Sequence, residues 1–248
     1  MFKNAFILVF HQTSNRYYPG INNIRPKDFW ALFSLIREWG YAFHHQDSAG
    51  DQFRKSVIVS FDDGYRDNYD ILMDLADRDI KTMVFVPGAF VGKSNHWEYS
   101  SRFFTASHLD KNEIKKLARA GIIFGAHGLT HRALTGLALR DVKLELIESR
   151  QRLEDITVNP IEYISFPFGR ISPRVIETSL ECGYRAGFVM DMDISRDDSF
   201  LFRRTPVYGS DSIYSLKARL EDNPLEKLKS RVINRLSSGT IILSEVLK

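Results

Sequence analysis

Short apolar runs alternate along the chain with longer segments in which apolar residues recur every three or four positions. The short runs are rich in Val, Ile and Phe, which is typical of strands buried on both faces. They predict seven strands, at Ala5–Phe10, Val57–Phe61, Thr82–Val86, Ile122–Ala126, Tyr163–Phe166, Ala186–Met190 and Thr240–Leu243. The longer segments predict helices at Pro26–Trp39, Asn68–Asp79, Asp110–Ala120, Leu139–Ile156, Pro173–Cys182 and Ser212–Leu236.

This alternation of strand and helix predicts an α/β fold with a mostly parallel sheet. A length of 248 residues suits closure of the sheet into a barrel, and we expect residues 1–248 to form a single domain. The least regular stretch is Gly88–His108, which is long enough to cross one face of the domain. Its aromatic residues, such as Trp97 and Tyr99, either stack on a bound ligand or pack the excursion against the domain.

The composition of the chain limits the classes of binding partner and the cellular compartment that we expect. The chain has 34 Lys and Arg against 31 Asp and Glu, interspersed along the sequence, so charge indicates neither a nucleic acid nor an anionic membrane as partner. One cysteine, Cys182, cannot form an intramolecular disulfide or a thiolate zinc site. The apolar run Ala5–Phe10 is far shorter than the roughly 20 residues of a membrane-spanning helix, and we expect a cytoplasmic protein without an export signal.

Two carboxylates, Asp62 and Asp63, directly follow the strand predicted at Val57–Phe61, and Gly64 permits a sharp turn after them. The C-terminal ends of barrel strands are where active sites lie. Adjacent side chains on an extended chain point in different directions, so one carboxylate can hold a metal while the other acts as a base. The alternative is a helix N-cap, a role for which Asp is well suited.

A pair of histidines, His127 and His131, follows the strand predicted at Ile122–Ala126. Spacing of four residues can bring two imidazole nitrogens to one metal ion, whereas a single histidine here would more often be structural. Together with an Asp at an equivalent strand end, the two histidines make a ligand set that leaves positions on a divalent metal open for water and substrate.

A third cluster, Pro167–Gly169, follows the strand predicted at Tyr163–Phe166 and by itself indicates only a loop. In residue type, order and context, the three clusters resemble the motifs of the polysaccharide deacetylase family, the NodB-like carbohydrate esterase family four. The resemblance extends from about Phe6 to Val207. It implies a distorted (β/α) barrel and metal-dependent removal of an acyl group from an N-acylated amino-sugar glycan.

The resemblance also implies roles for individual residues. Asp63, His127 and His131 would hold one divalent metal ion, with zinc as the expected ion, and Asp62 would be the general base. Phe168 would supply a backbone N–H to the oxyanion, and both Phe168 and Tyr65 are expected at the substrate.

Two departures from the family pattern affect the catalytic set. Many members carry an arginine two residues before the proline of the third motif, where this chain has Ser165; Arg204 is the expected replacement, with Arg203 and Arg170 as alternatives. Members also often end in a strand that carries the histidine that protonates the leaving amine, and the final apolar run here has none.

His11, at the end of the first predicted strand, is the expected general acid. A subgroup of the family acting on poly-N-acetylglucosamine places its histidine in this way, and first and last strands are neighbours in a closed barrel. The alternatives are that His11 only caps the strand, and that Asp62 serves as both base and acid. For the whole protein, two alternatives stay open: a deformylase or other amide hydrolase of the same superfamily, and an inactive carbohydrate-binding relative.

Overall fold

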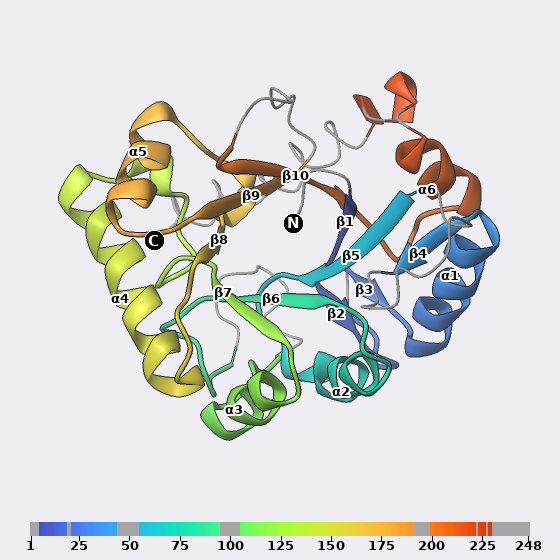
Figure 1. Ribbon diagram of the computed structural model, residues 1–248, viewed down its shortest axis with the longest axis horizontal. Coiled ribbons are helices and arrows are strands. Elements are labelled where there is room, and N and C mark those ends of the chain that lie inside the picture. The colour runs from blue at the N-terminus through green and yellow to red at the C-terminus, as the bar shows by residue number, and fades with distance from the viewer. Residues whose placement is uncertain are drawn as a thin grey trace.

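The structure is a computed structural model that describes residues 5–18, 21–43, 55–94, 105–190, 199–221, 223–226 and 228–229. In the view of Figure 1 the strands form a ring and the helices lie outside it. The strands are β1 (Ala5–Phe10), β2 (Gln12–Thr13), β3 (Asn23–Ile24), β4 (Tyr41–Phe43), β5 (Lys55–Phe61), β6 (Thr82–Val86), β7 (Ile123–Ala126), β8 (Tyr163–Ser165), β9 (Ala186–Met190) and β10 (Leu201–Pro206). The helices are α1 (Pro26–Glu38), α2 (Tyr69–Asp77), α3 (Lys111–Arg119), α4 (Leu139–Thr157), α5 (Pro173–Glu181) and α6 (Ile213–Leu220), with short 3-10 helices η1 (Arg66–Asn68), η3 (Leu134–Gly136) and η4 (Pro167–Gly169).

Seven of the described strands close a parallel barrel. Their order is β1, β10, β9, β8, β7, β6 and β5, and β5 pairs back with β1. Every neighbouring pair in this ring is parallel. Strand β4 joins the first part of β5 beside the ring. The predicted α/β barrel of about seven strands is therefore confirmed, and the C-terminal ends of all seven strands lie at one end of it.

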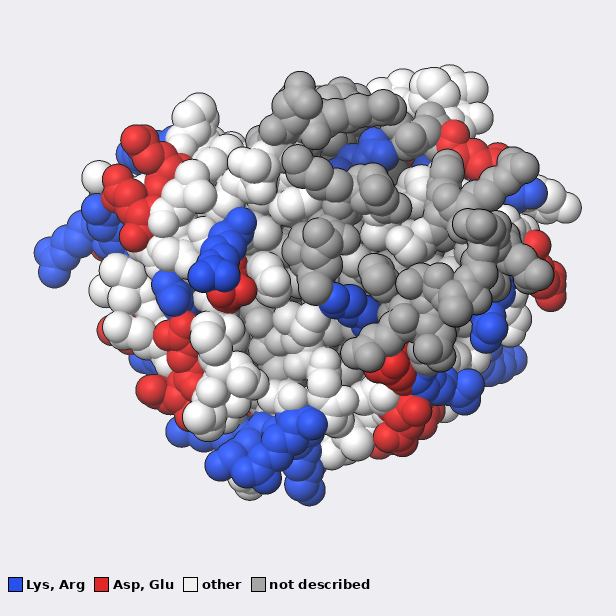
Figure 2. All heavy atoms as spheres, in the orientation of Figure 1, with Lys and Arg blue, Asp and Glu red and all other residues white. Residues whose placement is uncertain are grey.

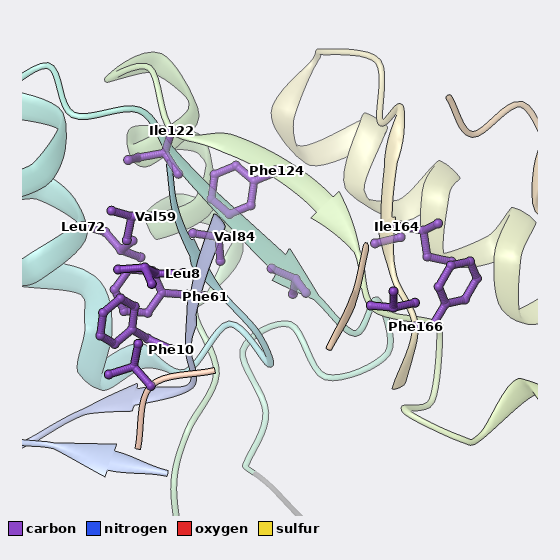
Figure 3. Packing of buried hydrophobic residues seen from close by; sticks show 14 of the residues in the cluster. Leu8, Phe10, Val59, Phe61, Leu72, Val84, Ile122, Phe124, Ile164 and Phe166 are labelled. Atoms are coloured by element: carbon purple, nitrogen blue, oxygen red, sulfur yellow. The ribbon is translucent and has the colours of Figure 1, made fainter. Parts of the chain in front are cut away.

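Side chains of the barrel strands point alternately into the barrel and out toward the helices. On β1, Leu8 and Phe10 point outward into the large core that the strands share with the helices (Figure 3). Ile7 points inward instead. We call the inner cluster of buried residues the floor of the barrel: Ile7, Ile58, Met83, Phe85, Ala186 and Phe188, each at most 3% exposed.

The sequence pattern predicted six of the seven ring strands to within two residues. The strand predicted at Thr240–Leu243 lies outside the described residues. The seventh ring strand is β10, which was not predicted because Arg203 and Arg204 interrupt its apolar residues. Packing in the closed barrel overrides this local pattern.

Five predicted helices correspond to α1–α5, with ends displaced by two residues or fewer. The sixth prediction, Ser212–Leu236, was wrong as one continuous helix, because α6 ends at Leu220; residues 224–226 and 228–229 are helical again, and residues 230–236 lie outside the described residues. Pro224 follows shortly after Leu220, and a residue that precedes proline is disfavoured in helical conformation.

The interpretation of residues 1–248 as one domain stays a prediction.

Within the part of the chain that the structure describes, no helix combines the length and the apolar character needed to cross a membrane. The visible face in Figure 2 carries basic side chains beside acidic ones around its rim. The excursion at Gly88–His108 is described only at its two ends, which Ser94 and Ser107 join by an antiparallel bridge. Its aromatic residues at 97 and 99 lie outside the described residues.

Candidate active site with a metal-ligand cluster

The inward-facing positions change from apolar to polar toward the C-terminal end of the barrel. On β5 the inward series continues from Ile58 through Ser60 to Asp62, and on β1 it continues from Ile7 to His11. Because β1 and β5 run in register up to their last residues, His11 lies beside Asp62. We call the polar inward set the mouth of the barrel: His11, Asp62, His127, Ser165 and Arg204.

The turn that follows β5 separates the two adjacent carboxylates. Asp63 and Gly64 both have left-handed backbone conformations, with φ of 67° and 62°. A Cβ atom at Gly64 would lie 2.9 Å from Val86 Cγ2, so glycine also permits the close approach to β6. The N-caps of the helices that follow are Tyr65 and Asn68, so the interpretation of the carboxylates as helix caps was wrong.

Asp62 forms a buried, two-pronged ion pair with Arg204. Nη1 of the guanidinium donates to Oδ1 and Nη2 donates to Oδ2, each over 2.7 Å. The Ser165 hydroxyl accepts from Nη2 at 2.6 Å and donates to Oδ2 at 3.1 Å. Burial alone would raise the pKa of Asp62, but the charge of Arg204, with smaller effects from His127 and His11, holds it below its ordinary value. Asp62 is therefore an ionised carboxylate in a fixed orientation.

Asp63, His127 and His131 form a buried group that could hold a metal ion, with candidate ligand atoms all within 4.8 Å of one another. Oδ1 of Asp63 lies 3.4 Å from Nε2 of His127 and 3.1 Å from Nε2 of His131. Ligands about 2.0–2.1 Å from a tetrahedral ion are roughly 3.3 Å apart, so the observed spacing fits such an ion. Burial would raise the pKa of Asp63, but the two histidines keep it well below its ordinary value.

The hydrogen bond of His127 also fits a metal ligand. Nδ1 of this ring donates to the backbone oxygen of Ser165 over 2.8 Å. Since a carbonyl oxygen can only accept, Nδ1 carries the hydrogen, and Nε2 is the ring atom that faces Asp63. Burial lowers the pKa of His127, but the charges of Asp62 and Asp63 raise it above its ordinary value, so the space between Nε2 and Asp63 favours a positive charge, either a proton or a metal cation. Ligating histidines in metal sites are typically oriented by such a second hydrogen bond.

The third motif packs against the histidine pair. Phe168 lies 4.7 Å from His131, ring centroid to ring centroid, with an edge-on angle of 73°. Phe168 and His131 both have positive φ, 59° and 57°, which is uncommon for residues with a side chain. Strained backbone of this kind is concentrated at functional sites. The role of Phe168 toward substrate stays a prediction.

The backbone around His11 is fixed from two sides. The Asp62 N–H donates to the Phe10 carbonyl oxygen over 2.9 Å. The buried side chain of Asn68 donates to the His11 carbonyl oxygen over 2.7 Å and accepts from the N–H and the hydroxyl of Thr13. Nδ1 of the His11 ring is buried and has no hydrogen-bond partner among the described residues, so this nitrogen does not cap the strand. Its role as general acid stays a prediction.

Tyr65 differs from the simplest expectation for a substrate-binding side chain. It is only 3% exposed, and its ring stacks on His108 at a centroid distance of 5.2 Å. A substrate-binding role for Tyr65 stays a prediction. His108, the partner of Tyr65, matches no motif and is buried: it is 1% exposed, and its Nδ1 contacts the Lys93 carbonyl oxygen.

Sequence reasoning missed two residues that support the site. Asn68 holds the backbone at His11, and Glu145 on α4 binds the loop between the two metal-site histidines. The signal for Glu145 was present, because it lies on the core-facing side of a helix, three residues after the buried Val142 and four before the buried Ser149. A charged residue at such a position normally has specific partners.

Comparisons with known proteins agree with this geometry. The family model for polysaccharide deacetylase matches residues 49–187, which include all three motifs. YxkH of Bacillus subtilis (strain 168), whose name places it among the polysaccharide deacetylases, is 26% identical over 206 residues, covering 79% of this chain and 68% of that protein.

Two solved structures share the fold. The deacetylase PplD of Streptococcus pyogenes, in complex with acetate, is 17% identical with a TM-score of 0.69, over 88% of this chain and 97% of that one. A de-N-acetylase from Aggregatibacter actinomycetemcomitans is 12% identical with a TM-score of 0.70, over 86% of this chain and 98% of that one. With more than half of its length matched by the family model, the chain belongs to the polysaccharide deacetylase family and is a hydrolase of carbon–nitrogen bonds other than peptide bonds.

Proposed function

We propose that this protein is a metal-dependent hydrolase that removes an N-acetyl group, or a related acyl group, from an amino-sugar residue of a glycan. The observation that carries the proposal is that two adjacent carboxylates have different partners. Asp63 faces two imidazoles, whereas Asp62 is ionised and paired with Arg204. A cation site next to an oriented, ionised carboxylate is what hydrolysis of an amide by activated water requires.

Two structural relatives support the choice of acyl group. PplD was solved with acetate, and the protein from Aggregatibacter actinomycetemcomitans is named a de-N-acetylase. Acetate is the product expected when an N-acetyl group is hydrolysed. We extend the N-acetyl group to this chain because it has the same fold and the Asp-Asp, His-His and Pro-Phe-Gly clusters.

Asp63, His127 and His131 are the residues that would hold the metal, and two imidazoles with one carboxylate suit zinc. A bound divalent ion supplies Lewis acidity, which lowers the pKa of water from about 15.7 to about 7 in the best zinc sites and polarises the acyl carbonyl.

The protein's own groups would carry the proton transfers. Asp62 takes a proton from the attacking water, and the guanidinium of Arg204 keeps the carboxylate ionised and aimed. The backbone N–H of Phe168 donates to the oxyanion that develops on the acyl oxygen. His11 gives a proton to the departing amine nitrogen, since an amine anion is too poor a leaving group to depart unaided.

The structure weakens the alternative hypothesis that the chain is an inactive carbohydrate-binding relative. It depended on the absence of the usual arginine at Ser165 and of the usual histidine at the C-terminus. Arg204 makes the two-pronged contact with Asp62, so that carboxylate does not lack its guanidinium. A deformylase remains the rival activity, because formyl and acetyl amides need the same machinery.

The test is acetate release from N-acetylated oligosaccharides by protein loaded with Zn²⁺, measured beside formate release from an N-formylated analogue. We expect acetate release that a chelator abolishes and added metal restores. Asp62→Asn, which preserves the shape of the side chain, should lower the rate by about a hundred- to ten-thousandfold and leave metal binding intact. Sugar binding without turnover would contradict the proposal, and formate release alone would change the substrate.

A further inference from the structure

Glu145, in the middle of α4, is a buried acid that makes no ion pair with any described residue. It is 3% exposed, although a carboxylate on this helix could have faced solvent, as that of Glu148 does. Burying a carboxylate is costly unless its oxygens receive hydrogen bonds. The hydrogen-bond partners of Glu145 therefore indicate which part of the molecule this buried carboxylate stabilises.

All of those partners belong to the loop between His127 and His131. Oε2 accepts from the N–H of Leu129 over 2.7 Å and from the N–H of Thr130 over 2.9 Å. Oε1 accepts from the Thr130 hydroxyl through a short hydrogen bond. One carboxylate thus satisfies three donors from two consecutive residues of this loop.

The remaining residue of the loop is held by the same helix. Ser149, one turn after Glu145, donates its hydroxyl to the Gly128 carbonyl oxygen over 2.7 Å. Gly128 has φ of 70°, and a Cβ atom there would lie 3.3 Å from Oε2 of Glu145. Helix α4 therefore holds each of residues 128–130 by a hydrogen bond, and the side chains that it uses, Glu145 and Ser149, are themselves buried.

This loop must meet a strict geometric condition. It has to bring both Nε2 atoms to one oxygen of Asp63, at the 3.4 and 3.1 Å observed, while His131 occupies a left-handed conformation. Such a conformation costs about 1–3 kcal/mol and persists only when the surroundings impose it. Glu145 accepts hydrogen bonds from Thr130, the residue directly before His131, and is therefore placed to impose this conformation.

We propose that Glu145 is a positioning residue for the metal site: by binding the backbone N–H groups of residues 129 and 130 together with the hydroxyl of Thr130, it presents His127 and His131 in the arrangement that captures the ion. The proposal rests on the proposed metal-dependent function and adds a residue to it. Among the described residues, the hydrogen-bond partners of Glu145 are loop residues rather than the ligand side chains, so its proposed effect reaches the metal through the loop.

The test measures metal binding rather than turnover. The variant is Glu145→Gln, which preserves the size of the side chain but replaces one acceptor oxygen by an NH₂ group facing the loop donors. The matched control is Glu148→Gln, which removes the same charge from an exposed position of the same helix, 47% exposed and paired with Arg152. Zn²⁺ affinity is measured by competition with a chromophoric chelator, and Co²⁺ absorption reports ligand geometry.

We expect Glu145→Gln to weaken Zn²⁺ binding by about ten- to a hundredfold and to change the Co²⁺ spectrum, as mutation of outer-shell partners typically does. Glu148→Gln should match the wild type in both measurements. Circular dichroism checks that Glu145→Gln is folded. An affinity and a spectrum equal to those of Glu148→Gln in a folded variant would overturn the positioning role.

A second variant decides the question if Glu145→Gln does not fold. Thr130→Val removes only the hydroxyl donor to Oε1, at a half-buried position. Weaker Zn²⁺ binding by threefold or more supports the proposal, and unchanged binding overturns it. Wild-type protein that binds no divalent ion would overturn the proposed function itself, whereas tight wild-type binding that Glu145→Gln shares would overturn the positioning role alone.

Discussion

The floor and the mouth of the barrel are built on the same strands, only a few residues apart, yet they do different work. The floor side chains of β5 and β6, Ile58 and Phe85, are fully buried hydrocarbon. The next two inward-facing residues after Ile58 are Ser60 and Asp62, and both bind Arg204. The strand alternation decides only that a residue faces inward, and its place along the strand decides whether it packs or reacts.

Arg204 marks the boundary between these regions. Its guanidinium lies 5.1 Å from the ring centroid of Phe85 in the floor, while its nitrogens bind Asp62 in the mouth. A dry, apolar floor strengthens electrostatic interactions above it, because little water screens them. The same dryness makes any unpaired charge costly. The floor is thus a condition for the chemistry of the mouth, and separate mutations in the two regions should have separable effects.

The largest effect is expected at the histidines of the metal-ligand cluster, which lies beside the mouth and shares His127 with it. Replacing His127 or His131 with Ala should abolish stoichiometric binding of Zn²⁺, because each removes one of three protein ligands. The fold should survive, because both side chains lie in the loop after β7 rather than in the apolar clusters. Metal content and circular dichroism of the purified variants measure both. Full metal occupancy in both variants would exclude these residues as ligands.

The next effect concerns the buried pair that joins the regions. Arg204→Met should destabilise the metal-free protein by about 3–5 kcal/mol, because Asp62 then keeps a buried charge without its partner. Arg204→Met combined with Asp62→Asn should recover much of this loss, since neither charge remains. Urea unfolding of the wild type, both single variants and the double variant gives the coupling energy. Additive losses would mean that the pair is not coupled as the contacts indicate.

A smaller effect is expected at His11, at the edge of the mouth. His11→Ala should lower kcat by about a hundredfold and flatten the alkaline limb of the pH–rate profile, because a general acid must be protonated to act. Zn²⁺ content should not change, since His11 is outside the ligand group. The pH–rate profile of the metal-loaded variant is the measurement. An unchanged rate and alkaline limb would assign both acid and base roles to Asp62.

The sequence predicted the floor better than it predicted the support of the mouth. Apolar runs located β1 and β9 to the residue, because buried strands have a local pattern. β10 has no such pattern, and Arg204 was selected only through the family resemblance.

The role of a residue whose partners lie far away in the sequence could not be predicted from the pattern of its neighbours. Asn68 binds the backbone at His11, 57 positions away, and Glu145 binds a loop 15 and 16 positions before it. The burial of His108 likewise involves a residue far away in the sequence, because its ring stacks on that of Tyr65. The chemistry-bearing motifs themselves were predictable, since each follows directly on a strand end.

The smallest effect is expected in the floor. Ile58→Val removes one methyl group from a fully buried side chain and should lower the free energy of unfolding by about 0.5–1.5 kcal/mol. Ile71→Val, the same change in the outer core at α2, is the matched control and should cost a similar amount. Neither should change kcat or Zn²⁺ affinity, because Ile58 belongs to the apolar floor cluster and Ile71 to the core between strands and helices, and neither is in the mouth or the metal-ligand cluster. A change in kcat of more than about twofold in Ile58→Val, but not in Ile71→Val, would show that packing of the floor sets the position of Asp62, and the two regions would then be one catalytic unit.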